Sequence, residues 1–359
     1  MGTGTTSHPE RGLEGSGQSP EPEGQARSCG GAEGRARSLA CAIVARADMG
    51  RDVTTVTHTS DELARDHALL MELAEPAAAL YERHLTVSKR WYPFEEVPWS
   101  HATDFARDEF DEGVYPLSDG IRSALIVNLL TEDNLPYYTS ALLRCVPDDH
   151  PLKEWSGRWT AEEWRHSSAI RDWVLATRAL DPWQLEDDRM VQMSTGIVPD
   201  ADTIAETLAY VSFQELATQV AHRNTSQALD KTLRGKKIMS LVAGDEGLHH
   251  AFYRDLATAA LERDPNLMLV AIARRLRTFR MPGLGIPGFA EHERAIAAAG
   301  IFDASQYVNQ VVHPTLAAWR LDELEGLDAD GERARVRIAK TVAALERIAS
   351  IAAPEPVAV

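Results

Sequence analysis

Residues 159–166 read Trp-Thr-Ala-Glu-Glu-Trp-Arg-His, in which Glu163 stands three positions before His166. Residues 245–249 read Asp-Glu-Gly-Leu-His and repeat that spacing with Glu246 and His249. Both stretches belong to long segments whose apolar residues recur every three or four positions, which is the period of an α-helix. Because residues three apart are neighbours on one face of a helix, each stretch presents a carboxylate beside an imidazole. The two stretches therefore predict two pairs of metal-binding side chains.

A single glutamate precedes each Glu-x-x-His motif by the same 31 residues: Glu132 precedes Glu163, and Glu215 precedes Glu246. Each of these glutamates continues the apolar face of its own predicted helix, so four helices each direct a carboxylate inward. Two helical hairpins of this kind, packed antiparallel, form the dinuclear metal site of a four-helix bundle. The repeat favours such a site over a set of solvated surface carboxylates.

Four buried carboxylates and two imidazoles require compensating positive charge, because an unpaired buried carboxylate is costly. No lysine lies on the same helix faces. A pair of metal ions would supply the charge, and this set of oxygen and nitrogen donors suits iron, with manganese as a substitute.

Helical periodicity dominates the chain beyond Ser118, and the alternation typical of strands is nearly absent. We therefore predict an all-α fold whose helices are long enough for a large bundle. Pro136 lacks the amide that would bond the Glu132 carbonyl, so the first long helix either breaks there or is distorted in a way that sets the ligand angle. The predicted helices cover residues 118–146, 159–180, 201–230, 234–262, 265–280, 290–300, 304–321 and 331–350.

The two ends of the chain differ in composition from the helical part. Ten of the 23 glycines lie between Gly2 and Gly50, where large apolar residues are scarce. Such a segment cannot bury enough surface to offset the entropy lost on ordering. We predict a disordered tail over residues 1–55, one folded domain over 56–350 and a loose tail over 351–359, with Met49 as an alternative start of translation.

The composition also disfavours several functional classes. A formal charge of −17 argues against a nucleic-acid-binding protein, which relies on basic surface. No stretch approaches the roughly 18 apolar residues of a membrane-spanning helix. Three cysteines, Cys29, Cys41 and Cys145, cannot form a disulfide framework, and they favour a reducing, cytoplasmic location.

Four blocks of the sequence, residues 130–136, 159–166, 212–218 and 245–249, resemble the motif blocks of the soluble acyl-acyl-carrier-protein desaturases, and most of all the actinobacterial members. The resemblance covers roughly residues 62–345. It implies a ferritin-like four-helix bundle with additional helices, a di-iron centre with two iron ions per chain, and a homodimer. The implied activity is the O2-dependent insertion of a cis double bond into a fatty acyl chain carried on acyl carrier protein, with electrons from reduced ferredoxin.

The resemblance also implies a role for individual residues. Thr218 matches a threonine beside the oxygen-binding position, although a helix threonine can simply bond its own backbone. Trp91 and Asp245 match, with His166, a chain of residues that passes electrons to iron. Alternatively, Trp91 is a packing aromatic and Asp245 only a hydrogen-bond acceptor for His166. The implied iron ligands, of which Glu163 and Glu246 would bridge, are Glu132, Glu163, His166, Glu215, Glu246 and His249.

Two positions of the second block depart from the family pattern. Trp164 stands where the family has asparagine, and Ser167 stands where it has glycine. Neither is an implied ligand, so the predicted metal site is intact. The substitutions leave open the acyl chain length, the position of the double bond and the donor surface.

Acyl carrier protein is acidic, as is this chain, so docking requires a local basic patch. The densest basic cluster is formed by Arg274, Arg275, Arg277 and Arg280, and a second cluster by Lys231, Arg234, Lys236 and Lys237. Either cluster can equally be a solvated helix end.

The chain has no flavin or nicotinamide fingerprint. Residues 283–288 match the pattern Gly-x-Gly-x-x-Gly, but they follow a predicted helix and contain Pro287, which indicates a loop.

Other readings of the same ligand set stay open. One alternative is a different ferritin-like oxygenase, either a hydroxylase or an N-oxygenase. N-oxygenases tend to need a further histidine ligand. No further histidine falls on these helix faces, and His222 is the nearest. A ribonucleotide reductase small subunit would have aspartate in place of Glu132. Iron-storage ferritins are about half this length and leave the helices beyond residue 265 unexplained. A desaturase paralogue without activity is the remaining alternative.

Overall fold

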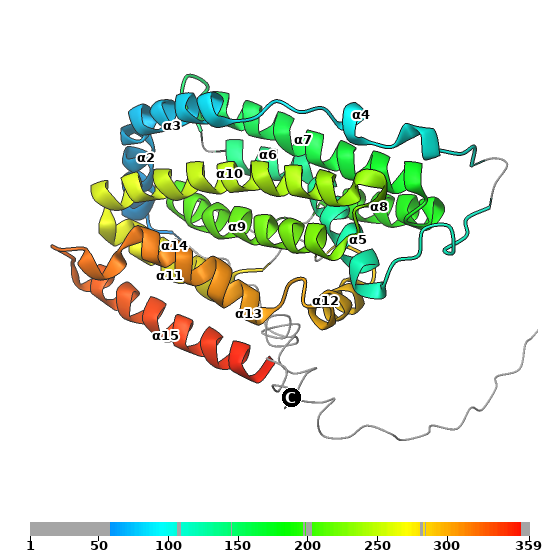
Figure 1. Ribbon diagram of the computed structural model, residues 1–359. Helices are drawn as coiled ribbons and strands as arrows, with labels where there is room; N and C mark the ends of the chain where they lie inside the picture. The colour runs from blue at the N-terminus through cyan, green and yellow to red at the C-terminus, as the bar shows by residue number, and fades with distance from the viewer. Residues whose placement is uncertain are drawn as a thin grey trace, which may run out of the picture.

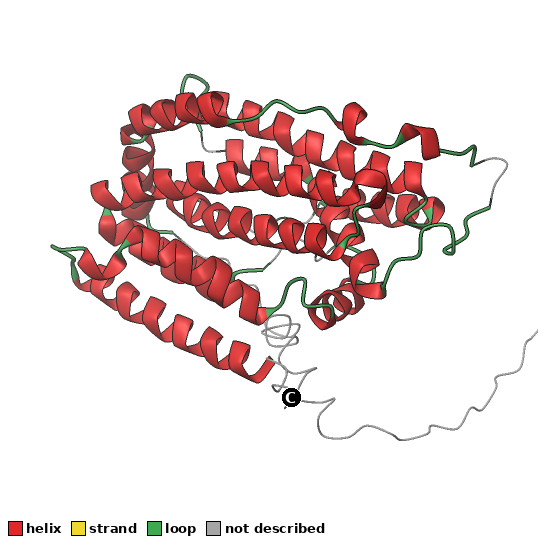
Figure 2. Ribbon diagram, viewed as in Figure 1, coloured by secondary structure: helices red, strands yellow, loops and turns green. Residues whose placement is uncertain are grey.

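The computed structural model describes residues 58–105, 109–144, 146–196, 198, 203–280, 283 and 285–352. These residues form helices joined by loops, with no strand among them (Figure 2). The predicted tail over residues 1–55 and all three cysteines lie outside this range, as do residues 353–359 of the predicted C-terminal tail. No helix in the described part of the chain is both long and apolar enough to span a membrane.

Four long helices form the centre of the molecule (Figure 1). They are α5 (Asp119–Asp133), α7 (Pro151–Thr177), α9 (Ile204–Ala228) and α10 (Gly235–Arg263). Helices α9 and α10 form one hairpin through the short turn η2 (Thr232–Arg234), and α5 packs on α7. This is the arrangement of two hairpins that the 31-residue repeat predicts.

The remaining helices surround this bundle. In Figure 1, α3 crosses one side of it, and α11, α14 and α15 cover another. Their bounds are α2 (Ser60–Glu72), α3 (Ala74–Val87), α4 (Pro93–Glu96), η1 (Trp99–His101), α6 (Leu135–Leu143), α8 (Pro182–Thr195), α11 (Pro265–Thr278), α12 (Phe289–Ala298), α13 (Ala304–Gln306), the π-helical turn η3 (Tyr307–Val312), α14 (His313–Trp319), η4 (Leu321–Glu323) and α15 (Ala329–Ala352).

The long helices begin at recognisable capping residues. Helix α7 starts with Pro151, which has no amide to leave unbonded, and the preceding His150 side chain accepts a hydrogen bond from the Leu152 amide. Helix α9 is capped twice: the Thr203 side chain accepts from the Glu206 amide, and the Asp66 carboxylate of α2 accepts from the first two amides of α9. The cap contributed by Asp66 fixes where α9, and with it Glu215, begins.

Two apolar cores lie on opposite sides of the Glu-x-x-His motifs along α7 and α10. One core includes Trp155 of α7 and Leu256 of α10, and the other includes Ile170 of α7 and Val242 of α10. Both cores are closely packed, with most of their side chains fully buried. They keep water from the polar residues between them and hold the helix faces that carry those residues.

The helix predicted over residues 118–146 is two helices in the structure. Helix α5 ends at Asp133 and α6 begins at Leu135, with Asn134 between them. Because Pro136 cannot bond the Glu132 carbonyl, the turn tightens, and the Asn134 amide bonds the Thr131 carbonyl at 3.2 Å. The break therefore follows directly after the turn that carries Glu132.

Candidate metal centre

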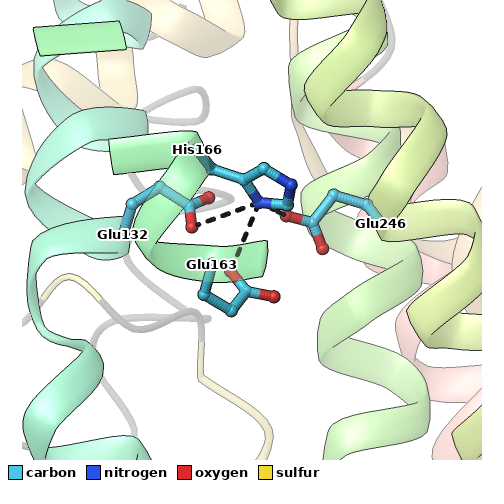
Figure 3. A group of neighbouring side chains, drawn as sticks. All are labelled: Glu132, Glu163, His166 and Glu246. Carbon is cyan, nitrogen blue, oxygen red and sulfur yellow. Dashed lines mark ion pairs between the residues drawn. The ribbon is translucent and has the colours of Figure 1, made fainter. Parts of the chain in front are cut away.

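The six predicted ligand residues meet inside the bundle, one from α5, two from α7, one from α9 and two from α10. They form two groups, and within each group one donor atom from every residue lies within 4.8 Å of the others. Glu163 and Glu246 belong to both groups. The first group is Glu132, Glu163, His166 and Glu246 (Figure 3), and the second is Glu163, Glu215, Glu246 and His249.

Each histidine turns its Nδ1 atom toward the carboxylates of its group. His166 Nδ1 lies 3.2 Å from an oxygen of Glu246, 3.5 Å from one of Glu163 and 3.8 Å from one of Glu132 (Figure 3). His249 Nδ1 lies 2.9 Å from Glu163, 3.6 Å from Glu215 and 3.8 Å from Glu246. The two imidazoles are therefore arranged in the same way around a shared pair of carboxylates.

Burial, mutual charge and hydrogen bonding raise the pKa values of three of these residues. Burial and the charges of Glu246 and Glu132 raise the pKa of Glu163 to about 7, and burial raises that of Glu215 well above its usual value. Burial lowers the pKa of His166, but its bonds to Asp245 and to the site carboxylates raise it well above the usual value. Raised pKa values of both carboxyl groups and an imidazole indicate an excess of negative charge in the centre, which bound cations would offset.

The hydrogen bonds of the six side chains leave their inward-facing donor atoms available for a pair of metal ions. One oxygen of Glu215 accepts from Trp159 and one oxygen of Glu246 accepts from Thr218. Five inward-facing atoms face one another and have no hydrogen bond of good geometry: Glu163 Oε1, His166 Nδ1, Glu215 Oε2, Glu246 Oε1 and His249 Nδ1. Buried polar atoms are ordinarily satisfied. A cluster of five buried donor atoms that face one another without such hydrogen bonds therefore fits bound cations.

The outer nitrogen of each histidine bonds a carboxylate. His166 Nε2 lies 3.2 Å from Asp245, which also accepts from the Trp91 indole at 2.9 Å and from Arg165 at 2.5 Å. The Trp91 ring stacks on His166 at a centroid distance of 6.5 Å. The three residues predicted to form a chain are thus in contact. His249 Nε2 lies 3.0 Å from Glu162, a residue that sequence reasoning did not single out. The available signal was that an acidic residue precedes the glutamate of both motifs.

Thr218 lies at the centre but also bonds its own helix. Its hydroxyl oxygen is 3.1 Å from Glu246 Oε2, and it is 3.0 and 3.2 Å from the carbonyl oxygens of Glu215 and Gln214. A hydroxyl carries one proton and can donate it to one strong acceptor at a time. Both hypotheses about Thr218 therefore have a contact that supports them.

His222 corrects the expectation that no further histidine reaches this face. Its Nε2 atom lies 2.9 Å from Glu132 Oε1 and 3.8 Å from Glu246 Oε1, and its side chain is buried. His222 follows Glu215 by seven residues, which is two turns of α9 and returns to nearly the same face. The nearby His166 and the hydrogen bond from His222 together overcome the effect of burial and lower the pKa of Glu132 to about 2.

The two departures in the second block have different surroundings. The Ser167 hydroxyl donates to Asp133, which also pairs with Arg189, so it ties α7 to α5 beside the predicted ligands His166 and Glu132. Trp164 is 63% exposed and lies at a surface depression of about 700 Å³, whose lining includes Trp91, Arg158 and Arg165. Neither side chain enters the centre.

Both predicted basic clusters are partly neutralised within the protein. Arg274 bonds Glu62 at 2.5 Å, and Arg275 pairs with the buried Glu206. In the second cluster, Arg234 and Lys237 pair with Glu96. Arg277 is exposed on α11.

Comparisons with known proteins give a consistent result. Residues 65–356 match a family described as fatty acid desaturase. The chain is 36% identical over 293 residues to the candidate acyl-acyl-carrier-protein desaturase DesA1 of Mycobacterium tuberculosis, covering 78% of this chain and 86% of that protein. It is 31% identical over 262 residues to the chloroplastic stearoyl-acyl-carrier-protein 9-desaturase 6 of Arabidopsis thaliana, covering 68% and 66%. The X-ray structure of the candidate desaturase DesA2 of M. tuberculosis superposes with a TM-score of 0.61 at 27% identity, covering 74% of this chain and 99% of that one.

Proposed function

The chain belongs to the fatty acid desaturase family, and we propose that it uses two iron ions to insert a cis double bond into a fatty acyl chain carried on acyl carrier protein. The prediction of an all-α, ferritin-like fold is confirmed by the likeness to a solved desaturase. The observation that carries the proposal is the pair of donor groups that share Glu163 and Glu246. Such sharing is the geometry of a dinuclear carboxylate site in a helical bundle.

Six side chains would hold the metal ions. Glu132 and His166 would bind one ion, Glu215 and His249 the other, and the two shared glutamates would bridge them. Manganese would fit the same donors. When bound, the iron ions supply the activation of O2 and the removal of hydrogen from an unactivated methylene group.

The residues of the chain supply the surroundings for this chemistry. The apolar cores exclude water from the centre. The Thr218 hydroxyl lies where it can hold or pass a proton at Glu246 Oε2. The contacts between Trp91, Asp245 and His166 support a path for electrons from the surface depression to the centre.

The proposal extends to partners and location. Two external electrons per turnover would come from a ferredoxin-type donor, and the protein would act as a cytoplasmic homodimer on acyl carrier protein thioesters. Residues 56–350 would form the desaturase domain between tails at 1–55 and 351–359; the family match over residues 65–356 supports a single catalytic unit. The exposed Arg277 and the partly exposed Arg280 of the first basic cluster are the proposed contact for the acidic carrier.

The test is a reconstituted reaction. The protein is incubated with ferredoxin, its reductase, NADPH and a panel of acyl carrier protein thioesters, and the released acids are identified by mass analysis. We expect a mono-unsaturated acid and about two irons per chain, and Glu246→Ala and Glu215→Ala should lose both the metal and the product.

Three outcomes would contradict parts of the proposal. A hydroxy acid in place of an alkene would indicate a hydroxylase. Two irons per chain without consumption of O2 in the presence of reduced ferredoxin would indicate a paralogue without activity. Full metal content in the Glu246→Ala variant would remove Glu246 from the ligand set.

A further inference from the structure

Glu132 differs from the other five predicted ligands in its place along its helix. It is the last but one residue of α5, whereas Glu163 and His166 lie near the middle of α7, and the predicted ligands of α9 and α10 lie near the middle of theirs. The carbonyls of a last helical turn lack intrahelical partners, and helix ends fray. Pro136 adds to this, because it has no amide to offer the Glu132 carbonyl. The backbone of Glu132 therefore depends on other elements for a fixed position.

Asp133, the next residue, supplies a contact to two other helices. Its side chain is buried; one oxygen accepts from the Ser167 hydroxyl of α7, and the other accepts from Arg189 Nε of α8. Ser167 is also buried and directly follows the predicted ligand His166. The residues that follow Glu132 and His166 are thus bonded to each other.

The arginine on the outer side of Asp133 is held in turn. Arg189 Nη1 lies 3.2 Å from Glu186 Oε1, and Glu186 Oε2 lies 3.2 Å from Arg171 Nη2. Arg171 follows Ser167 by four residues, about one turn further along α7. The contacts therefore form a closed ring through α5, α8 and α7. The part-exposed pairs at Glu186 contribute little by themselves, so the buried carboxylate of Asp133 is the central member of the ring.

The location of this contact makes it more than a bond between packed helices. His166 Nδ1 lies 3.8 Å from Glu132 Oε2, and the two side chains face each other from α7 and α5 (Figure 3). A shift of the last turn of α5 along α7 would change this separation directly. Metal sites require donor distances that are fixed to about 0.2 Å. A bond between the residues that follow the two ligands opposes such a shift.

We propose that Asp133, held by Ser167 and Arg189, is a positioning residue that fixes Glu132 relative to His166 at the metal position formed by the first group. The inference rests on the dinuclear site of the proposed function. None of the three residues belongs to either donor group. Their loss should therefore weaken the metal position that Glu132 serves and leave the other.

The experiment is an anaerobic titration of the metal-free protein with cobalt(II), followed by absorption spectroscopy and by metal analysis after gel filtration. We expect two tight sites in the parent protein. Ser167→Ala removes the hydroxyl and Asp133→Ala removes the carboxylate, and each should weaken one site roughly 10- to 100-fold and leave the other unchanged. The double variant should be no weaker than Asp133→Ala alone, because both substitutions break the same contact.

Glu132→Ala identifies the position concerned. This variant loses the ligand that the contact holds and should retain one tight site, and adding Ser167→Ala should not change the affinity of that site. The matched control is Ser156→Ala, because Ser156 is another buried serine of α7, and its hydroxyl bonds the Leu152 carbonyl of its own helix at 2.7 Å. It should keep two tight sites with the affinities of the parent.

Thermal unfolding of the metal-free variants separates positioning from packing. A packing role lowers the Tm without changing the ratio of the two cobalt affinities, whereas a positioning role changes that ratio. Arg189→Gln breaks the other bond of Asp133 from a part-exposed side chain. It should weaken the same site, and it carries the test if Ser167→Ala does not fold.

Two results would overturn the inference. Parent affinities at both sites in Ser167→Ala and Arg189→Gln would show that the contact serves packing alone. A weaker remaining site when Ser167→Ala is added to Glu132→Ala would show that the contact does not act through Glu132. A parent protein that binds no cobalt would overturn the proposed metal centre and this inference with it, so the two failures are distinguishable.

Discussion

At the residue scale, the role of Thr218 depends on which acceptor its hydroxyl proton bonds. Its hydroxyl has three acceptors within hydrogen-bond distance, of which two are carbonyls of its own helix and one is Glu246 Oε2. When it donates to the backbone, it is an ordinary helix threonine. When it donates to Glu246, it acts on a shared ligand of both proposed metal positions.

The substitution Thr218→Val removes the hydroxyl and nearly keeps the volume. If the hydroxyl holds or passes a proton during the oxygen steps, we expect retained iron, retained O2 uptake and more hydrogen peroxide released per double bond formed. O2 consumption, peroxide and alkene are measured in the same reaction.

Thr207→Val is the control for this prediction, because Thr207 lies on the same helix and its hydroxyl bonds the Thr203 carbonyl. It should leave the ratio of peroxide to alkene unchanged. An unchanged ratio in Thr218→Val as well would assign Thr218 to the backbone-bonding role alone.

At the scale of elements, the position of α5 depends on a close approach to α12. A Cβ atom added at Gly120 would lie 2.3 Å from the Ala299 Cβ atom and 2.9 Å from the Ala295 carbonyl oxygen. Such distances force the two helices apart, because backbone atoms cannot give way as a flexible side chain does. Glu132 lies at the other end of α5, so this contact helps to fix Glu132 at the proposed metal centre.

We therefore expect Gly120→Ala to lower the free energy of unfolding by about 1–3 kcal/mol. Urea-induced unfolding followed by circular dichroism measures the change. Gly157→Ala, at an exposed position in the first half of α7 where an added Cβ meets nothing within 4 Å, is the matched control. There the higher helix propensity of alanine should stabilise the protein by up to about 1 kcal/mol. Equal effects of the two substitutions would show that the α5–α12 contact is not tight.

At the scale of the whole molecule, the charge distribution governs how an acidic partner is bound. The chain has a formal charge of −17, and most arginines of the two basic clusters pair with its own carboxylates. Arg275 faces the buried Glu206 and is not positioned for a partner. Arg277, on the exposed side of α11, is the better candidate within the first cluster.

Charge reversal at these two neighbouring positions should therefore have different effects. Arg277→Glu should raise the Michaelis constant for the acyl carrier protein thioester with little change in turnover number, and added salt should raise the parent's constant in the same way. Arg275→Glu should instead destabilise the fold by about 3–5 kcal/mol, since it removes one partner of a buried ion pair.

Steady-state kinetics and thermal unfolding separate the two effects. Arg83→Glu on α3, which reverses a half-exposed arginine elsewhere, controls for the change in net charge. A Michaelis constant that is unchanged in Arg277→Glu would move the docking site to the turn at Lys231 and Lys236.

Much of the site could be predicted from the sequence, because the spacings that define it lie within single helices or between helices that are neighbours along the chain. The spacing between Glu163 and His166, repeated at Glu246 and His249, sets a helix face, and the apolar periodicity sets which face is inside. The repeat of 31 residues then pairs the helices. All six predicted ligand residues do meet in the folded chain, in two groups with the two expected shared glutamates.

Contacts between helices were decided only by the tertiary structure. His84 and Glu162 meet across α3 and α7, and His222 meets Glu132 across α9 and α5. Arg275 is neutralised by a glutamate far away in the sequence. Periodicity states which way a side chain points, but the residue it meets depends on the register, crossing angle and start of a neighbouring helix. Those quantities arise from the packing of the whole core, so the sequence of one segment cannot determine them.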